Sequence, residues 1–188
     1  MLTRIAFASF ALAAVAAAQS SLAINPNTGA GALQYLWVPG PTTNPVAFFM
    51  DMTVTNPITI QGASFPSYTP VGQQITVEFY TANAPFTTYV GNEVTAANWT
   101  LRASGSSVIP SAPTAANVCW GAGIQLAPGT YGVAILVRNA NNLFSNLGPQ
   151  TIANADLSVT VGAVSAQAFT QPPSAYGTQT FHFNGTLF

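Results

Sequence analysis

The stretch Ile75-Thr-Val-Glu-Phe-Tyr-Thr81 decides the fold of this chain, because apolar and polar side chains alternate along it. Ile75, Val77 and Phe79 fall on one face of an extended chain, and the polar residues between them fall on the other. A period of two is typical of a strand with one buried face. The stretch therefore predicts a half-buried β-strand.

A second alternating run, Trp99-Thr-Leu-Arg-Ala103, follows a connection rich in breaking residues. If the two runs pair, Trp99 and Leu101 extend the apolar face of the first strand. On the solvent face, Glu78 is then expected to meet Arg102. We expect this pair of strands to form the nucleus of a β-sandwich.

Further strands are expected along the chain, separated by turns rich in Pro, Gly and Asn. The clearest are 46–54, 118–126, 130–137 and 156–164, with weaker candidates at 34–38, 58–65 and 178–188. Segment 130–137 is apolar on both faces, which predicts a central strand. Gly121 and Gly123 interrupt 118–126 and predict a bulge or a close backbone approach there. No segment beyond the N-terminal one has helical periodicity, so the sequence predicts an all-β, antiparallel, jelly-roll-like sandwich of eight to ten strands.

Residues 1–18 have the pattern of an export signal. Arg4 precedes an apolar run over 5–15, and Ala16-Ala-Ala18 supplies the small residues that a signal peptidase needs. We expect cleavage before Gln19, which leaves residues 19–188 as a single domain. The run is shorter than the roughly 20 residues of a spanning helix, and no second such run follows. The mature protein is therefore expected to be secreted, either extracellular or at the cell surface, with no membrane span.

Charged residues make up 4% of the chain, against about 25% in an average soluble domain. There is no lysine, and the mature chain has 2 minus 4, or −2, side-chain charges: Arg102 and Arg138 against Asp51, Glu78, Glu93 and Asp156. Nucleic acids and anionic membranes bind clusters of Lys and Arg, which are missing here. A hydrophobic content of 49% also argues against disorder. We expect a folded domain with a nearly neutral surface, and such surfaces associate readily.

The sequence contains no motif for catalysis, a metal or a cofactor. No motif brings two of the four acids together as a hydrolytic pair, and His182, the sole histidine, has no Gly-x-Ser-x-Gly elbow to accompany it. Structural zinc needs about four Cys or His ligands, and the chain has one of each. Calcium needs clustered oxygens, which the isolated acids do not supply, and the carbonyls of the 139–142 loop are the remaining candidate ligands. We therefore expect a protein that is not an enzyme and has no cofactor.

A few residues remain as candidates for other roles. Cys119 is expected to be a buried strand thiol, with a bridge to a partner as the alternative. Asn98-Trp-Thr100 and Asn184-Gly-Thr186 are sequons, so Asn98 and Asn184 are candidate glycosylation sites. Tyr89 lies in a loop and is the aromatic residue that we expect to stack on a ligand such as a sugar ring.

Five short motifs follow one another along the last two thirds of the mature chain: Val77-x-Phe-Tyr80, Tyr89-Val-Gly91, Trp99-Thr-Leu101, Leu126-Ala-Pro-Gly-Thr-Tyr-Gly132 and Asn184-Gly-Thr-Leu187. Together they resemble a loose group of exported bacterial β-sandwich proteins of uncharacterised function. The resemblance implies a fold and a compartment, and it implies no catalytic residues. Members often carry a C-terminal sorting segment of Pro-Glu-Pro, an apolar stretch and basic residues. The sequence ends at Phe188 without one, so anchoring by that route is not expected.

Two functions of different classes remain. The composition of the whole chain favours a non-enzymatic structural protein, a subunit of an extracellular matrix, fibre or cell-surface assembly that associates with itself or with other surface proteins. Sheet edges are usually protected by lysine, inward charges or proline; without lysine, either prolines and loops or another subunit must cover them. The alternative is a carbohydrate-binding or adhesive module whose aromatic side chains meet a polysaccharide. A secreted hydrolase is a distant third.

Overall fold

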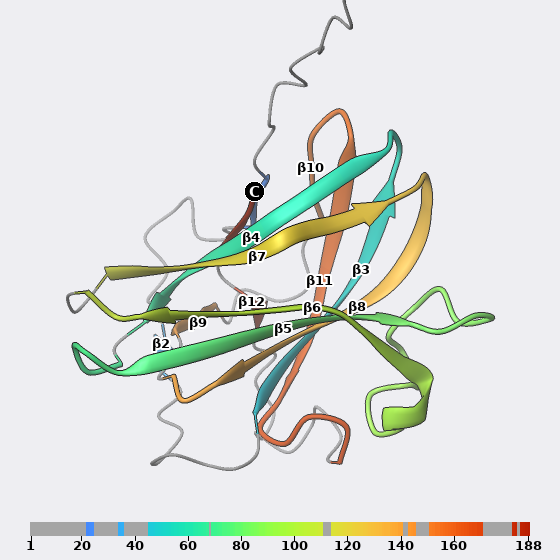
Figure 1. Ribbon diagram of the computed structural model, residues 1–188. Helices are drawn as coiled ribbons and strands as arrows, with labels where there is room; N and C mark the ends of the chain where they lie inside the picture. The colour runs from blue at the N-terminus through green and yellow to red at the C-terminus, as the bar shows by residue number, and fades with distance from the viewer. Residues whose placement is uncertain are drawn as a thin grey trace, which may run out of the picture.

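The computed structural model describes residues 22–24, 34–35, 45–67, 69–110, 114–140, 143–145, 151–170, 182–183 and 185–188. In this part of the chain the expected all-β sandwich is confirmed: a six-stranded and a four-stranded antiparallel sheet pack face to face (Figure 1). The expected signal segment 1–18 lies outside the described residues. No helix among the described residues is long and apolar enough to cross a membrane.

The six-stranded sheet contains three of the four strands that the sequence predicted most clearly, 46–54, 130–137 and 156–164. Its order is β10 (Thr151–Ala153), β11 (Leu157–Ser165), β3 (Val46–Val54), β8 (Gly129–Arg138), β5 (Gln74–Ala82) and β6 (Trp99–Val108). β8 is central, as its two apolar faces predicted, since it pairs with β3 on one side and with β5 on the other. A short 3-10 helix, η1 (Ala96–Asn98), leads into β6.

The second sheet has the order β1 (Leu22–Ile24), β13 (Gly185–Leu187), β4 (Ile58–Ser67) and β7 (Thr114–Leu126). A third, smaller sheet joins β12 (His182–Phe183), β9 (Leu143–Ser145) and β2 (Gln34–Tyr35). β9 and β10 both fall between the expected strands 130–137 and 156–164, where the sequence predicted no strand. Figure 1 shows β4 and β7 side by side, forming the layer opposite β3, β5 and β8.

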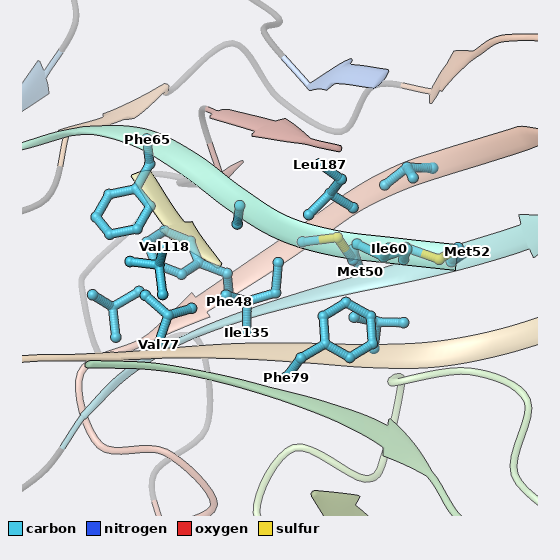
Figure 2. Packing of buried hydrophobic residues seen from close by; sticks show 14 of the residues in the cluster. Phe48, Met50, Met52, Ile60, Phe65, Val77, Phe79, Val118, Ile135 and Leu187 are labelled. Atoms are coloured by element: carbon cyan, nitrogen blue, oxygen red, sulfur yellow. The ribbon is translucent and has the colours of Figure 1, made fainter. Parts of the chain in front are cut away.

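The main core lies between the two large sheets. Alternate residues of β3, β5 and β8 point into it, and Ile75, Val77 and Phe79 are fully buried there, as predicted. Figure 2 shows Phe48, Val77, Phe79 and Ile135 facing Ile60, Phe65 and Leu187 of the opposite sheet. Burial of apolar surface on this scale is the dominant favourable term in folding.

The prediction for Trp99 and Leu101 is wrong. The register between β5 and β6 shifts between Phe79 and Tyr80, where Arg102 is the extra residue of a bulge. One extra residue moves the preceding side chains to the other face of the sheet. Trp99 is therefore buried on the outer face, away from the main core, and Leu101 is 49% exposed.

The glycines of β7 do mark an irregularity, as the sequence predicted. The register between β4 and β7 shifts between Ile60 and Gly62, which are paired with Ile124 and Cys119. Gly123 has a φ of +70°, a conformation that favours glycine. The bulge therefore needs a glycine at this position.

The two long edge strands, β6 and β7, lie next to each other where the sheets meet. Gly105 approaches the carbonyl oxygen of Cys119 so closely that a Cβ atom at position 105 would overlap it. Among the described strands, the opposite edges of the two sheets are β10 and β1, each three residues long. Very short edge strands offer little surface for pairing, so the sandwich protects its edges without lysine.

Candidate functional site

The outer face of the six-stranded sheet holds a group of aromatic side chains that is separate from the main core. We call it the outer aromatic cluster and define it as Phe49, Tyr80, Tyr89, Trp99 and Phe169. Phe169 lies near its centre, with ring centroids 5.3 Å from Tyr80 and 5.5 Å from Trp99. Such contacts add about 0.5–1.5 kcal/mol each to the burial of area.

Two glycines allow the loop between β5 and β6, residues 83–98, to lie on this face. A Cβ atom at Gly132 would be 2.5 Å from the backbone carbon of Thr88, and one at Gly162 would overlap the ring of Tyr89. Gly162 lies at the register shift between Val161 and Ala163 in β11. Larger side chains at either position would lift the loop from the sheet.

Asp51 fixes the loop to β3. Its carboxylate accepts a hydrogen bond from the Thr88 hydroxyl (2.8 Å) and one from the backbone N–H of Tyr89 (2.9 Å). Tyr89 is half-buried and stacks on Phe49 with the ring centroids 6.1 Å apart. Burial raises the pKa of Tyr89 above its ordinary value of 10.0, and the carboxylates of Asp51 and Glu93 raise it further.

Asn92 organises the far part of the loop. Its backbone carbonyl accepts the indole N–H of Trp99 (2.9 Å), and its side-chain oxygen accepts the amide N–H of Asn98 (2.7 Å). Its own amide donates to the carbonyl oxygen of Thr88 (3.2 Å). Asn98, the candidate glycosylation site, is thus half-buried, and its amide nitrogen bonds to Asn92.

The prediction that Glu78 pairs with Arg102 is wrong. Glu78 instead binds Arg138 of β8, with Nε to Oε1 at 2.9 Å and Nη2 to Oε2 at 3.1 Å. Arg102 contacts the Thr81 hydroxyl at 3.4 Å. The hydroxyl of Tyr80 also donates to Glu78 (3.0 Å). The pKa of Arg138 is raised by its hydrogen bond to Glu78, and the opposite charges of the two side chains offset each other.

The remaining predicted residues have other surroundings. Cys119 is exposed on β7, so the prediction of a buried thiol is wrong: Val118 and Trp120 point inward, and the residue between them points out. The backbone of His182 pairs with Ser145 in the small sheet. Asn184 lies outside the described residues.

Three of the four acidic residues of the described chain make contacts in separate places. Asp51 binds the loop, Glu78 binds Arg138, and Asp156 accepts the Asn56 amide at 2.9 Å. Among the described residues, no group of three or more His, Cys, Asp or Glu side chains is placed to hold a metal ion. The geometry of the outer face is that of a loop anchored on a sheet, and its contacts are hydrogen bonds to the Asp51 carboxylate, the ion pair of Glu78 and Arg138, and apolar packing.

Exposed apolar side chains are the feature that sequence reasoning missed. Phe86, Val90 and Val94 of the loop are 39%, 60% and 47% exposed, and Leu101 follows at 49%. Phe86 is the aromatic residue that the described part of the chain exposes most clearly. The absence of charged residues between 79 and 101, apart from Glu93, is the sequence signal that could have found this stretch.

No protein-family model matches the chain, and no curated protein matches it. The resemblance drawn from the sequence motifs, and the function expected from the composition, therefore stay predictions.

Proposed function

We propose that the protein is a non-enzymatic, secreted structural protein, a subunit of an extracellular matrix, fibre or cell-surface assembly. The observation that supports the proposal best is the set of exposed apolar side chains Phe86, Val90, Val94 and Leu101 on a chain with 4% charged residues. Burying apolar surface stabilises association by about 25 cal/mol per Å². Few charges oppose such contact, because the ion pair of Glu78 and Arg138 is already internally neutral.

The contact that we propose does not use the long sheet edges. β6 and β7 lie against each other at Gly105, and the opposite edges are short. Association is therefore expected to depend on the apolar side chains of the loop between β5 and β6.

A matched pair of variants tests this. Val90→Ser with Val94→Ser removes two exposed apolar residues of the loop. Val71→Ser with Val108→Ser removes two at the opposite end of the β5–β6 pair, where they are 61% and 54% exposed. In size-exclusion chromatography and negative-stain images of residues 19–188, the first variant should shift to monomer and the second should assemble like the wild type. A wild-type protein that stays monomeric at every concentration would contradict the proposal.

The alternative is a carbohydrate-binding or adhesive module, and the exposure of Phe86, in the same loop as Tyr89, favours it. Tyr89→Ala would unseat the loop as well as remove the ring, so Tyr89→Phe and Phe86→Ala are the better probes. Sugar binding predicts retention on a polysaccharide column that Phe86→Ala weakens at least several-fold while Tyr89→Phe keeps it. No retention on any tested glycan would set this alternative aside.

A further inference from the structure

We propose that the loop between β5 and β6 pairs with the same loop of a second copy around a two-fold axis, with Glu93 of each copy against Arg102 of the other. The inference rests on the proposed function, and it names the partner of the loop and the geometry of the contact. Apolar side chains supply the affinity of this contact, and the two charges fix its orientation.

The loop holds its exposed side chains in fixed turns. Val90 is a central residue of a turn that the Asn92 N–H closes on the Tyr89 carbonyl (2.9 Å). Val94 is a central residue of the next turn, which the Thr95 N–H closes on the Asn92 carbonyl (3.1 Å). Asn92, which belongs to both turns, is 4% exposed. A loop that is already ordered loses little conformational freedom when it binds, and this favours association.

The loop and the start of β6 carry one charge of each sign outside any ion pair. The ion pair among the described charged side chains joins Glu78 to Arg138. Glu93 has no cationic partner among the described residues, and Arg102 has no carboxylate partner there. The guanidinium of Arg102 contacts the Thr81 hydroxyl at 3.4 Å. Both charges are therefore available to a second molecule.

The two charges lie beside exposed apolar side chains. Glu93 directly precedes Val94, and Arg102 directly follows Leu101. After burial, the nearby carboxylates of Asp51 and Glu93 raise the pKa of Tyr89, so this part of the loop is negative. The contact surface thus has a negative side in the loop and a positive side on β6. We define it as Phe86, Val90, Glu93, Val94, Leu101 and Arg102.

A surface with one charge of each sign is complementary to a copy of itself. Around a two-fold axis, if one residue contacts a second residue of the other copy, the reverse contact also forms. Each negative side then meets a positive side, whereas a contact that brings like charges together is opposed. This complementarity is the reason for choosing a second copy as the partner. A two-fold contact closes on itself, so it makes a pair, the unit from which a larger assembly would be built.

Two charge reversals test the pairing between copies. Glu93→Arg gives a copy with two positive charges at the contact surface, and Arg102→Glu gives a copy with two negative ones. Each variant alone should raise the dissociation constant of the pair at least about tenfold in about 0.01 M salt, where the Debye length is about 30 Å. An equimolar mixture of the two variants should recover the wild-type value to within about threefold, because opposite charges meet again. Sedimentation velocity measures the constant in each case.

Val71→Arg and Val71→Glu are the matched controls, because Val71 is 61% exposed at the opposite end of the β5–β6 pair. Both should associate like the wild type. In about 1 M salt, where the Debye length is about 3 Å, the two variants of the contact surface should also associate like the wild type. This recovery would show that both variants are folded.

The outcomes separate the two proposals. A wild-type protein that associates, together with a mixture as weak as the separate variants, would refute the two-fold pairing and leave the structural function standing. Variants that associate like the wild type in low salt would do the same. A wild-type protein that stays monomeric at every concentration, including one that binds a polysaccharide instead, would overturn both.

Discussion

The ring of Tyr89 lies against Gly162, in the space that any side chain at position 162 would occupy. One residue belongs to the loop between β5 and β6, and the other to a bulge in β11 at the far side of β3. The loop is thus anchored on a surface shaped for it, and the exposed apolar residues that it carries are held in place by this contact.

Gly162→Ala should displace the Tyr89 ring and destabilise the protein by about 1–3 kcal/mol, the range for overpacking. Gly121→Ala is the matched control, because nothing lies within 4 Å of a Cβ atom there and its φ is not positive. Its effect should stay within about 0.5 kcal/mol. Urea unfolding of both variants measures the difference, and equal midpoints would show that the ring does not depend on Gly162.

The two buried tryptophans should respond differently to replacement by phenylalanine. The indole N–H of Trp99 donates to Asn92, whereas that of Trp120 has no hydrogen-bond partner among the described protein atoms. Trp99→Phe loses a bond worth about 1 kcal/mol, and Trp120→Phe removes a buried unsatisfied donor. We expect Trp99→Phe to be the more destabilising by roughly 1 kcal/mol in chemical unfolding. The opposite order would be incompatible with these contacts.

Stability should fall at high pH because of two tyrosines. Burial is the largest cause that raises the pKa of Tyr80 and of Tyr89, and neighbouring carboxylates raise both further. The unfolded chain, whose tyrosines titrate near pH 10, then binds fewer protons than the folded one. The resulting stability is complete below about pH 10 and is lost as the pH rises through the folded-state pKa values.

Urea midpoints between pH 8 and 11.5 measure this loss. Tyr80→Phe with Tyr89→Phe should make it smaller, because two of the groups that cause it are gone. If the double variant loses as much stability between pH 8 and 11.5 as the wild type, groups other than Tyr80 and Tyr89 cause the loss.

Cys119 should react in the folded protein, because its side chain is exposed on β7. After reduction, about one thiol per chain should be labelled by a disulfide reagent without denaturant, as the sequence contains one cysteine. A Cys119 thiol that reacts with the reagent only in urea would contradict this, and would support the buried thiol that the sequence predicted.

Local alternation was enough to predict most of the long strands, but not the short strands β1, β9 and β10. β3 has the bounds that its alternation indicated, and both apolar faces of β8 are buried. The position of Cys119 was also available from alternation, since the inward residues Val118 and Trp120 flank it. The wrong prediction for Cys119 followed the average tendency of cysteine to be buried, whereas the local alternation indicated exposure.

Strand order and bulges could not be predicted in the same way. Arg102 is an extra residue in β6, and nothing in the alternation of Trp99 and Leu101 marks it. The partner of Glu78 depends on β8 lying beside β5, which is a long-range property of the sheet. Likewise, the need for glycine at positions 132 and 162 comes from the loop between β5 and β6, which lies over both residues. Their own strands do not indicate it.

The central claim is that this nearly uncharged sandwich associates through apolar contact. Sedimentation of residues 19–188 over a wide range of concentrations, in low salt and in about 1 M salt, tests it most directly, because the Debye length at 1 M is about 3 Å and ionic contacts are screened. The claim predicts a mass that rises with concentration and does not fall in high salt. A monomer throughout, or association that high salt abolishes, would contradict it.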